Sequence, residues 1–205
     1  MKLKDCFENT IIIEKSKFIT YLSRIESEEE AKEYIMKIKK IHPNASHHCS
    51  AFICFKNNTL QRSNDDGEPK GTAGSPMLNV LNKYGIENTV AVVVRYFGGI
   101  KLGAGGLIRA YSSSVSKALD LAPKVETINF HQYIITVPYD LNSKVEHYIR
   151  SNSENFEVTY DLSCTYIFTT NIESVYDDLS ELSSGRFLPE FITDIIIEKE
   201  IEKSV

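Results

Sequence analysis

Hydrophobic residues in the first half of the chain predict a sheet built from at least three segments. β-branched and aromatic residues fill residues 10–25, which indicates one long strand or a bent pair of strands, and residues 49–55 indicate another strand. Residues 89–96 are almost continuously apolar, which is typical of a strand covered on both faces. We therefore expect residues 89–96 at the centre of the sheet.

Helical spacing of apolar residues alternates with these strands. Ser27 and Glu30 match a capping box, in which the serine oxygen accepts a free backbone N–H and the glutamate accepts the N–H of the cap residue itself. Apolar residues then recur on one helical face from Ala31 until Pro43 ends the run. The sequence thus predicts a first helix with a defined start and end.

Two further helices are predicted before residue 124. Ser75 and Pro76 supply a cap residue and a first-turn proline, and Gly85 stands where a C-terminal glycine stop belongs. Apolar positions repeat at helical spacing again from Leu107 until Pro123. Because this last helix follows residues 89–96, the intervening loop joins a central strand to a long helix.

The second half of the chain has the order β-α-β-β-α-β. The predicted strands are residues 127–138, 156–162, 164–171 and 191–200, and the predicted helices are residues 142–151 and 174–183. This order predicts an α+β, ferredoxin-like sandwich of two helices on an antiparallel sheet. We expect two domains, residues 1–124 and 125–205, and the first is a two-layer β-α domain.

Composition excludes several classes of protein. In 205 residues the longest apolar runs are far below the roughly 18 residues that a membrane-spanning helix needs, and the N-terminus lacks the apolar core of a secretory signal. The four cysteines are scattered without a C-x-x-C pair, which argues against a disulfide framework or a zinc knuckle. We expect a cytoplasmic protein without a cofactor.

Charge differs sharply between the two halves. Residues 1–124 hold 18 Lys and Arg against 13 Asp and Glu, a net charge of +5, whereas residues 125–205 hold 5 against 15, a net charge of −10. A polyanion such as RNA should approach the basic half, because the acidic half repels it. The alternative is ordinary surface charge that keeps the chain in solution.

Glycine is concentrated between residues 98 and 106. The cluster lies at a strand-to-helix turn, where free backbone N–H groups and the helix dipole can hold phosphate or carboxylate. Arg95, Lys101 and Arg109 add positive charge, and we place Arg109 in the first helical turn. The predicted anion or RNA site therefore comprises Arg95, Gly98, Gly99, Lys101, Gly103, Gly105, Gly106 and Arg109. The alternative is that the glycines only allow close packing of the helix on the sheet.

An acidic loop forms a second candidate site. It lies at the end of the polar segment 56–70, in which Asn57-Asn58 and Asp65-Asp66-Gly67 favour turns. The candidate residues of this possible second site are His48, Asp65, Asp66, Glu68 and Lys70, and of these Asp66 and Glu68 could hold Mg²⁺ through oxygen ligands. The alternative is an ordered connector whose carboxylates cap backbone donors.

Known catalytic motifs are incomplete or missing. His47-His48-Cys49 cannot converge on one point, since neighbouring side chains of a strand point to opposite faces, so a metal site or a Cys–His pair is disfavoured. We expect His48 or Cys49, but not the whole trio, to approach the acidic loop. There is no P-loop, no complete dinucleotide fingerprint, no G-x-S-x-G and no H-E-x-x-H. The sequence identifies no catalytic residue and no metal site.

With these segments in view, the chain resembles the IMPACT/YigZ family of translation-associated proteins. The resemblance rests on residues 47–52, 65–76 and 94–111, which read HHCSAF, DDGEPKGTAGSP and VRYFGGIKLGAGGLIRAY. The signatures are specific for about residues 7–121, and the remainder is similar only in layout to the ferredoxin-like C-terminal domain of bacterial members.

The resemblance implies a fold and a partner. The first domain should resemble domain IV of elongation factor G and certain ribosomal proteins, the second should resemble domain V of that factor, and ribosome or RNA contact is the implied function. Eukaryotic members have an additional N-terminal domain that helps to engage a regulator of translational control, and that partner is not expected here.

Three functional hypotheses follow. The first is a non-enzymatic binding module that contacts RNA or the ribosome through the basic half, although only Tyr96, Phe97 and Tyr111 offer aromatic rings near the glycine loop. The second is a small-molecule enzyme or phosphate-ligand-binding protein that uses the acidic and glycine-rich loops. The third is a protein-interaction surface on the acidic half.

Overall fold

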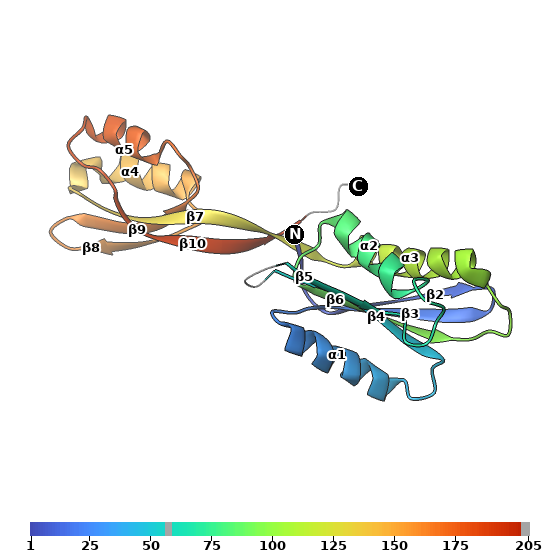
Figure 1. Cartoon of the computed structure of the whole chain (residues 1–205). Coiled ribbons are helices and arrows are strands. Elements are labelled where there is room, and N and C mark those ends of the chain that lie inside the picture. Colours follow the sequence, from blue (N-terminus) through green and yellow to red (C-terminus); the bar gives the residue numbers. More distant parts are fainter. Residues whose placement is uncertain (56–58, 202–205) are drawn as a thin grey trace. The chain divides into compact units, whose positions relative to one another are not determined.

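The computed structural model describes residues 1–55 and 59–201, and the chain divides into two compact units. Unit 1 comprises Met1–Glu126 with the residues from Glu200 onward, and unit 2 comprises Thr127–Lys199. Both units combine helices with antiparallel sheets, so the α+β class is observed (Figure 1). The turn expected at Asn57-Asn58 lies outside the described residues.

Unit 1 contains a five-stranded antiparallel sheet in the order β2-β3-β6-β4-β5. Its strands are β2 (Phe7–Ile13), β3 (Ser16–Arg24), β4 (His47–Cys54), β5 (Leu60–Asn64) and β6 (Thr89–Tyr96). Residues 10–25 form the predicted bent pair, because β2 and β3 make a hairpin. The expectation that residues 89–96 are central is confirmed, since β6 pairs with both β3 and β4. The sequence did not predict β5, an edge strand with three exposed polar residues.

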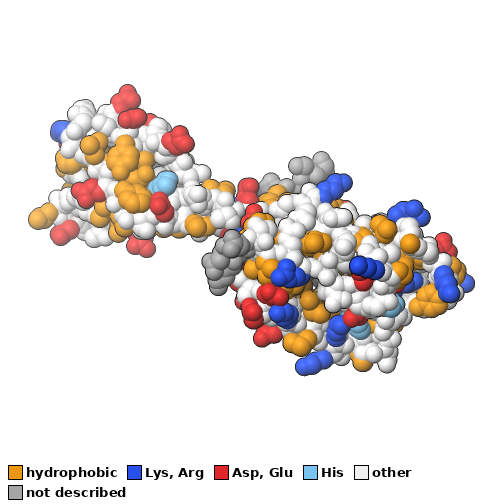
Figure 2. All heavy atoms as spheres, in the orientation of Figure 1, with side chains coloured by type: hydrophobic (Ala, Val, Ile, Leu, Met, Phe, Trp, Pro, Cys, Tyr) orange, Lys and Arg blue, Asp and Glu red, His pale blue; other side chains and the backbone are white. Residues whose placement is uncertain are grey.

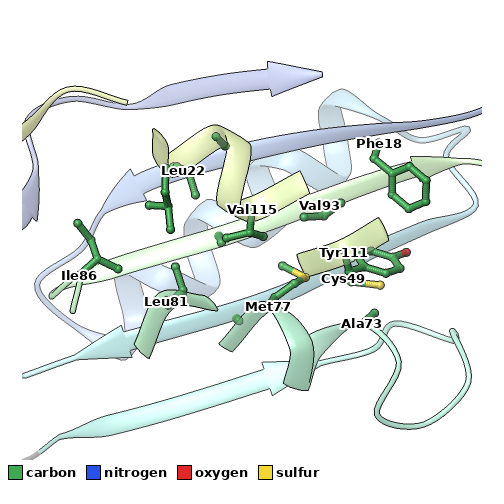
Figure 3. Packing of buried hydrophobic residues seen from close by; sticks show 14 of the residues in the cluster. Phe18, Leu22, Cys49, Ala73, Met77, Leu81, Ile86, Val93, Tyr111 and Val115 are labelled. Carbon is green, nitrogen blue, oxygen red and sulfur yellow. The ribbon is translucent and has the colours of Figure 1, made fainter. Parts of the chain in front are cut away.

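Three helices cover the two faces of this sheet. Figure 1 shows α1 (Glu28–Ile41) on one face and α2 (Gly74–Tyr84) and α3 (Gly103–Leu121) on the other. The larger core lies under α2 and α3, where Cys49, Val93 and Tyr111 pack with residues of both helices (Figure 3). A smaller core lies under α1.

Helix ends show where local sequence signals succeed. Ser27 accepts the N–H of Glu30 at 3.2 Å, as predicted, but the Glu30 carboxylate accepts the N–H of Glu26 at 2.8 Å, one residue before the cap. Gly85 ends α2 in the left-handed conformation, as predicted. The prediction that Ser75 caps α2 is wrong, because the helix begins at Gly74 and its cap position is Ala73.

The chain ends of unit 1 meet at a short additional pairing. β1 (Lys2–Leu3) pairs with the first residues of β7 (Lys124–Val137), and Leu3 is fully buried. The N–H of Ile201 donates to the carbonyl of Lys124 at 2.9 Å. Both ends of the described chain therefore belong to the same unit.

Unit 2 shows the predicted β-α-β-β-α-β order. After β7 follow α4 (Tyr139–Asn152), β8 (Asn155–Tyr160), β9 (Cys164–Thr170), α5 (Val175–Ser183) and β10 (Glu190–Glu200). The sheet order is β10-β7-β9-β8, and both helices lie on one face of it (Figure 1). The ferredoxin-like assignment and the likeness to elongation factor G stay predictions. No helix among the described residues is long and apolar enough to cross a membrane.

Candidate functional site

Both candidate loops belong to unit 1 and lead into its two neighbouring helices. The acidic loop joins β5 to α2, and the glycine loop joins β6 to α3. Since α2 and α3 pack on the same face of the sheet, their N-terminal ends bring the two loops together. The two loops differ in how many of their polar groups already form hydrogen bonds or ion pairs within the protein.

Asp65 holds the start of α2. One of its carboxylate oxygens accepts the N–H groups of Ala73 and Gly74 at 3.0 and 2.8 Å, and the other accepts the N–H of Gly71 at 2.8 Å. Burial acts to raise the pKa of Asp65, but the three backbone N–H groups, led by that of Gly71, outweigh it and lower the pKa. Asp65 thus caps α2 in place of Ser75, from ten positions away in sequence.

Asp66 ties the acidic loop to α1 and β4. Its carboxylate contacts the Lys39 ammonium at 2.6 Å and accepts the backbone N–H of His48 at 2.7 Å. Burial opposes these contacts, yet the net effect lowers the pKa of Asp66. The residue itself has a left-handed φ of 45°. Asp66 is therefore a structural clamp in this conformation.

Glu68 is buried between Arg95 and Tyr111. One carboxylate oxygen contacts the Arg95 guanidinium at 2.7 Å and accepts the Tyr111 hydroxyl at 2.8 Å. Glu68 and Arg95 are 8% and 5% exposed, so this ion pair lies inside the unit. Burial raises the pKa of Tyr111, which keeps the hydroxyl protonated as the donor. Sequence reasoning considered Tyr111 only as an aromatic ring near the glycine loop, because nothing in the motif shows its distant partner Glu68.

His47 and Cys49 lie on the same face of β4, toward this buried pair. The Nδ1 atom of His47 is 2.9 Å from the carbonyl of Asp66, and its Nε2 is 3.8 Å from Glu68. The thiol of Cys49 donates to the carbonyl of Asp65 at 2.9 Å, and burial raises its pKa to about 12. A protonated, fully buried thiol is a poor nucleophile.

His48 corrects one expectation and supports another. Its side chain contacts the carbonyl of His42 at 2.9 Å, so it alternates with its neighbours as predicted. However, all three residues of the His47-His48-Cys49 run contact the acidic loop, because the His48 backbone N–H also reaches Asp66. The expectation that the whole trio would not approach the loop was wrong, because Nδ1 of the His48 ring also lies 3.5 Å from the Asp66 carboxylate while its Nε2 contacts His42.

The remaining ligand hypotheses for the acidic loop find little support in its geometry. Lys70 is exposed and makes no ion pair with any described residue. Asp66 and Glu68 were considered for Mg²⁺, but within residues 1–55 and 59–201 no group of three or more His, Cys, Asp or Glu is arranged to hold a metal ion. The connector interpretation describes this loop better.

The glycines of the other loop serve different purposes. A Cβ on Gly98 would lie 2.0 Å from the carbonyl carbon of Lys15, so this glycine permits close packing on the β2–β3 turn. Gly99 and Gly103 have φ of 86° and 66°, which other residues rarely adopt. Gly105 and Gly106 belong to the first turn of α3, and a Cβ on Gly106 would meet Leu102 at 2.9 Å.

The three cations of the predicted anion site separate into two kinds. Arg95 is buried against Glu68, so it is not a free surface charge. Lys101 and Arg109 are exposed and make no ion pair with any residue that the structure describes. Arg109 lies in the second turn of α3 rather than the first, because the helix already starts at Gly103. Of the three predicted cations, Lys101 and Arg109 are the two that offer accessible positive charge.

The start of α3 is open to a negatively charged group. The cap residue Leu102 provides no side-chain acceptor, and the first turn contains no acidic residue. Gly103, Ala104 and Gly105 are all exposed. Free N–H groups and the positive end of the helix dipole favour anions at such a position.

A pocket of about 300 Å³ connects the two loops. Its lining combines the buried ion pair with the start of α3, and consists of Glu68, Pro69, Arg95, Phe97, Lys101, Leu102, Gly103, Ala104 and Leu107. The sequence did not predict the contributions of Leu102 and Leu107, because a helical apolar pattern does not distinguish core from pocket wall.

Comparison with known proteins identifies relatives of the whole chain. Residues 14–119 match the model of the Impact N-terminal domain. The IMPACT family member YvyE of Bacillus subtilis (strain 168) is 45% identical over 193 residues, covering 90% of this chain and 87% of that protein.

Two solved structures are also similar. A crystal structure described as a hypothetical protein has 30% identity and a TM-score of 0.58, covering 93% of this chain and 96% of the other. The structure of the two-domain translational regulator Yih1 has 26% identity and a TM-score of 0.37, covering 58% of this chain and 46% of the other. With the domain match and the extended similarity to YvyE, the chain belongs to the IMPACT family.

Proposed function

We propose that this protein is a non-enzymatic, translation-associated binding module that contacts RNA or the ribosome through unit 1, in the cytoplasm. The translation link comes from the family resemblance, and the basic character of residues 1–124 supports contact with a polyanion. Figure 2 shows Lys and Arg side chains spread over the visible face of unit 1.

One observation carries this proposal. Lys101 and Arg109 stand exposed, without ion pairs among the described residues, beside the uncapped start of α3. A surface cation without a protein partner exchanges only counterions when it meets a phosphate, so it can add to binding. Arg95 does not take part, because Glu68 already neutralises it.

Charge reversal tests the assignment. The double variant Lys101→Glu and Arg109→Glu should weaken binding to ribosomes or single-stranded RNA at least ten-fold, and the slope of log Kd against log salt should become shallower. The measurement is fluorescence anisotropy with labelled RNA, or cosedimentation with ribosomes, at several salt concentrations.

A control variant with the same change in net charge shows whether the position of the reversed charges matters. Lys40→Glu with Lys117→Glu reverses two other exposed cations, one at the end of α1 and one far along α3. If the control variant loses as much affinity as the test variant, binding follows net charge alone and this surface is wrong. If the test variant binds like wild type at every salt concentration, the proposal fails.

A second candidate function has its own supporting observation. The pocket of about 300 Å³ joins the acidic and glycine-rich loops, which is where a phosphate-bearing small ligand was expected. We propose this ligand-binding role as the alternative. A screen of phosphate metabolites, with and without Mg²⁺, would contradict it if none raised the Tm of the protein.

A protein partner for unit 2 is a separate proposal. It rests on the net charge of unit 2, where residues 127–199 hold 4 Lys and Arg against 12 Asp and Glu, a charge of −8 that suits a basic partner. Co-purification of a partner by the full chain, lost when unit 2 is removed, is the expected result.

A further inference from the structure

The pocket beside α3 contains a buried cation with unused hydrogen-bonding capacity. Arg95 is 5% exposed, and a guanidinium has five N–H donors. One end of it contacts Glu68 at 2.7 Å, and a second nitrogen reaches Ser16 only at 3.5 Å. Its Nε atom has no partner among the described residues. A buried donor without an acceptor is costly, so an acceptor group in this pocket would be stabilised.

The charges around the pocket favour an anion. Glu68 and Arg95 neutralise one another, which leaves the exposed Lys101 as the remaining charged side chain in the lining. The uncapped start of α3 adds the positive end of a helix dipole at Gly103 and Ala104. Lys101 and the start of α3 therefore both attract a negatively charged ligand group.

The rest of the lining is largely apolar and aromatic. Phe97, Leu102 and Leu107 contribute to it, and the Phe97 ring is 50% exposed although it lies at the pocket. The Arg95 guanidinium lies 5.6 Å from the centre of this ring, which helps to hold the ring in place. A held, accessible aromatic ring is a good platform for stacking.

Size restricts the ligand further. About 300 Å³ is at the lower end of small-molecule sites, which span roughly 300–1,000 Å³. This volume suits a ligand of mononucleotide size with one anionic group and is too small for a large cofactor.

We propose that the pocket binds a free, mononucleotide-sized anion, with its phosphate at Lys101 and the start of α3 and its planar ring on Phe97. The inference rests on the second candidate function and names its ligand class. A hydrogen-bond acceptor on the ligand would approach the guanidinium of Arg95, whose Nη2 reaches Ser16 only at 3.5 Å.

Calorimetric titration of the full chain tests the ligand class. The probes are the four nucleoside 5′-monophosphates, the matching nucleosides, ribose 5-phosphate and inorganic phosphate. At least one monophosphate should bind, and both its nucleoside and ribose 5-phosphate should bind about ten-fold more weakly, because each lacks one of the two groups. Equal affinity for inorganic phosphate would overturn the ring assignment but leave a phosphate-binding pocket. No binding by any probe would overturn both.

Variants test the placement. Phe97→Ala should weaken the monophosphate about ten-fold but leave inorganic phosphate unchanged, and Phe97→Tyr should restore affinity because it keeps the ring. Lys101→Gln should weaken both probes, whereas Lys117→Gln should weaken neither, since ten or more helical residues separate it from the pocket, roughly 15 Å. Unchanged monophosphate affinity in Phe97→Ala, with an unchanged Tm, would contradict the proposed pose.

A final arm distinguishes a free ligand from one nucleotide of an RNA chain. An RNA oligonucleotide of the same base should displace the bound monophosphate only at higher nucleotide concentration, because Lys101 borders both the pocket and the proposed RNA surface. Binding of RNA that weakens in Phe97→Ala, without any binding of the monophosphate, would overturn the inference and instead extend the RNA surface into the pocket.

Discussion

The acidic loop and the glycine loop carry equally suggestive sequences, but the structure uses them in opposite ways. Every carboxylate of the acidic loop is occupied: Asp65 by backbone N–H groups, Asp66 by Lys39, and Glu68 by Arg95. The glycine loop instead leaves two cations exposed. A cluster of charged residues is thus a site only where its hydrogen bonds are not already used within the fold.

The two loops also have different roles in the protein. The acidic loop supplies rigidity, because it fixes the start of α2 and the buried ion pair that borders the pocket. The glycine loop supplies accessibility. Stability measurements should therefore respond to the charged residues of the acidic loop, and binding measurements should respond to the exposed cations Lys101 and Arg109.

Removal of the buried carboxylate should have the largest effect on stability. Glu68→Ala leaves the Arg95 charge buried without its partner, which costs about 3–5 kcal/mol of the free energy of unfolding. Urea denaturation followed by circular dichroism measures this loss. The double variant Glu68→Ala with Arg95→Met should recover most of it, since no buried charge remains. A loss below about 1 kcal/mol in the single variant would contradict a buried ion pair.

Asp65→Asn should have the next largest effect. One of the two carboxylate oxygens and the negative charge are lost from the α2 cap, at a cost of about 1.5–3 kcal/mol for hydrogen bonds to a charged group. The exposed Asp5→Asn variant is the matched control and should unfold like wild type. Equal stability of the two variants would show that the acidic loop does not hold α2.

The same carboxylate predicts a direction of pH dependence. The pKa of Asp65 in the folded protein is lowered from its ordinary value of 3.8. Its contribution is therefore complete above pH 3.8 and is lost as the pH falls through the lowered folded-state pKa. The stability difference between wild type and Asp65→Asn should shrink over that acidic range. A difference that stays constant there would contradict the assignment.

Alanine substitutions at two positions of the glycine loop should have smaller effects on stability, and these effects should have opposite signs. Gly98→Ala places a Cβ against the Lys15 backbone and should cost about 1–3 kcal/mol. Gly105→Ala meets only the flexible end of Arg109 at 3.9 Å, within a helix, and should stabilise by about 0.5–1 kcal/mol. The measurement is again urea denaturation. Effects of the same sign would mean that the two glycines do not differ as described.

Local signals in the sequence predicted much of the fold. The glycine stop at Gly85, the serine cap at Ser27 and the central position of residues 89–96 each follow from a few neighbouring residues. The polar edge strand β5 had no such pattern, because an exposed edge does not require alternating apolar residues. The prediction that Ser75 caps α2 was wrong because the helix begins at Gly74, whose N–H donates to the carboxylate of Asp65.

The candidate site was predictable only in part. Lys101 and the glycines of residues 98–106 were identified from their clustering at a strand-to-helix turn, but the helix begins at Gly103, four residues before the predicted apolar pattern at Leu107. The burial of Arg95 was not predicted, because its partner Glu68 is 27 positions away. The sequence does not distinguish a buried, paired arginine from an exposed one. Sequence shows which chemical groups are present, whereas the fold decides which of them remain accessible.

The pairing of Ile201 with Lys124 has a practical consequence for dividing this chain. Because the segment that follows unit 2 returns to unit 1, unit 2 is an insertion into unit 1 rather than a tail. Truncation after residue 124 would remove Val125, the partner of Lys2 in β1, as well as the returning segment. A stand-alone version of unit 1 is better made by splicing Glu126 to Glu200 through a short linker, which keeps both flanking segments of the insertion in place.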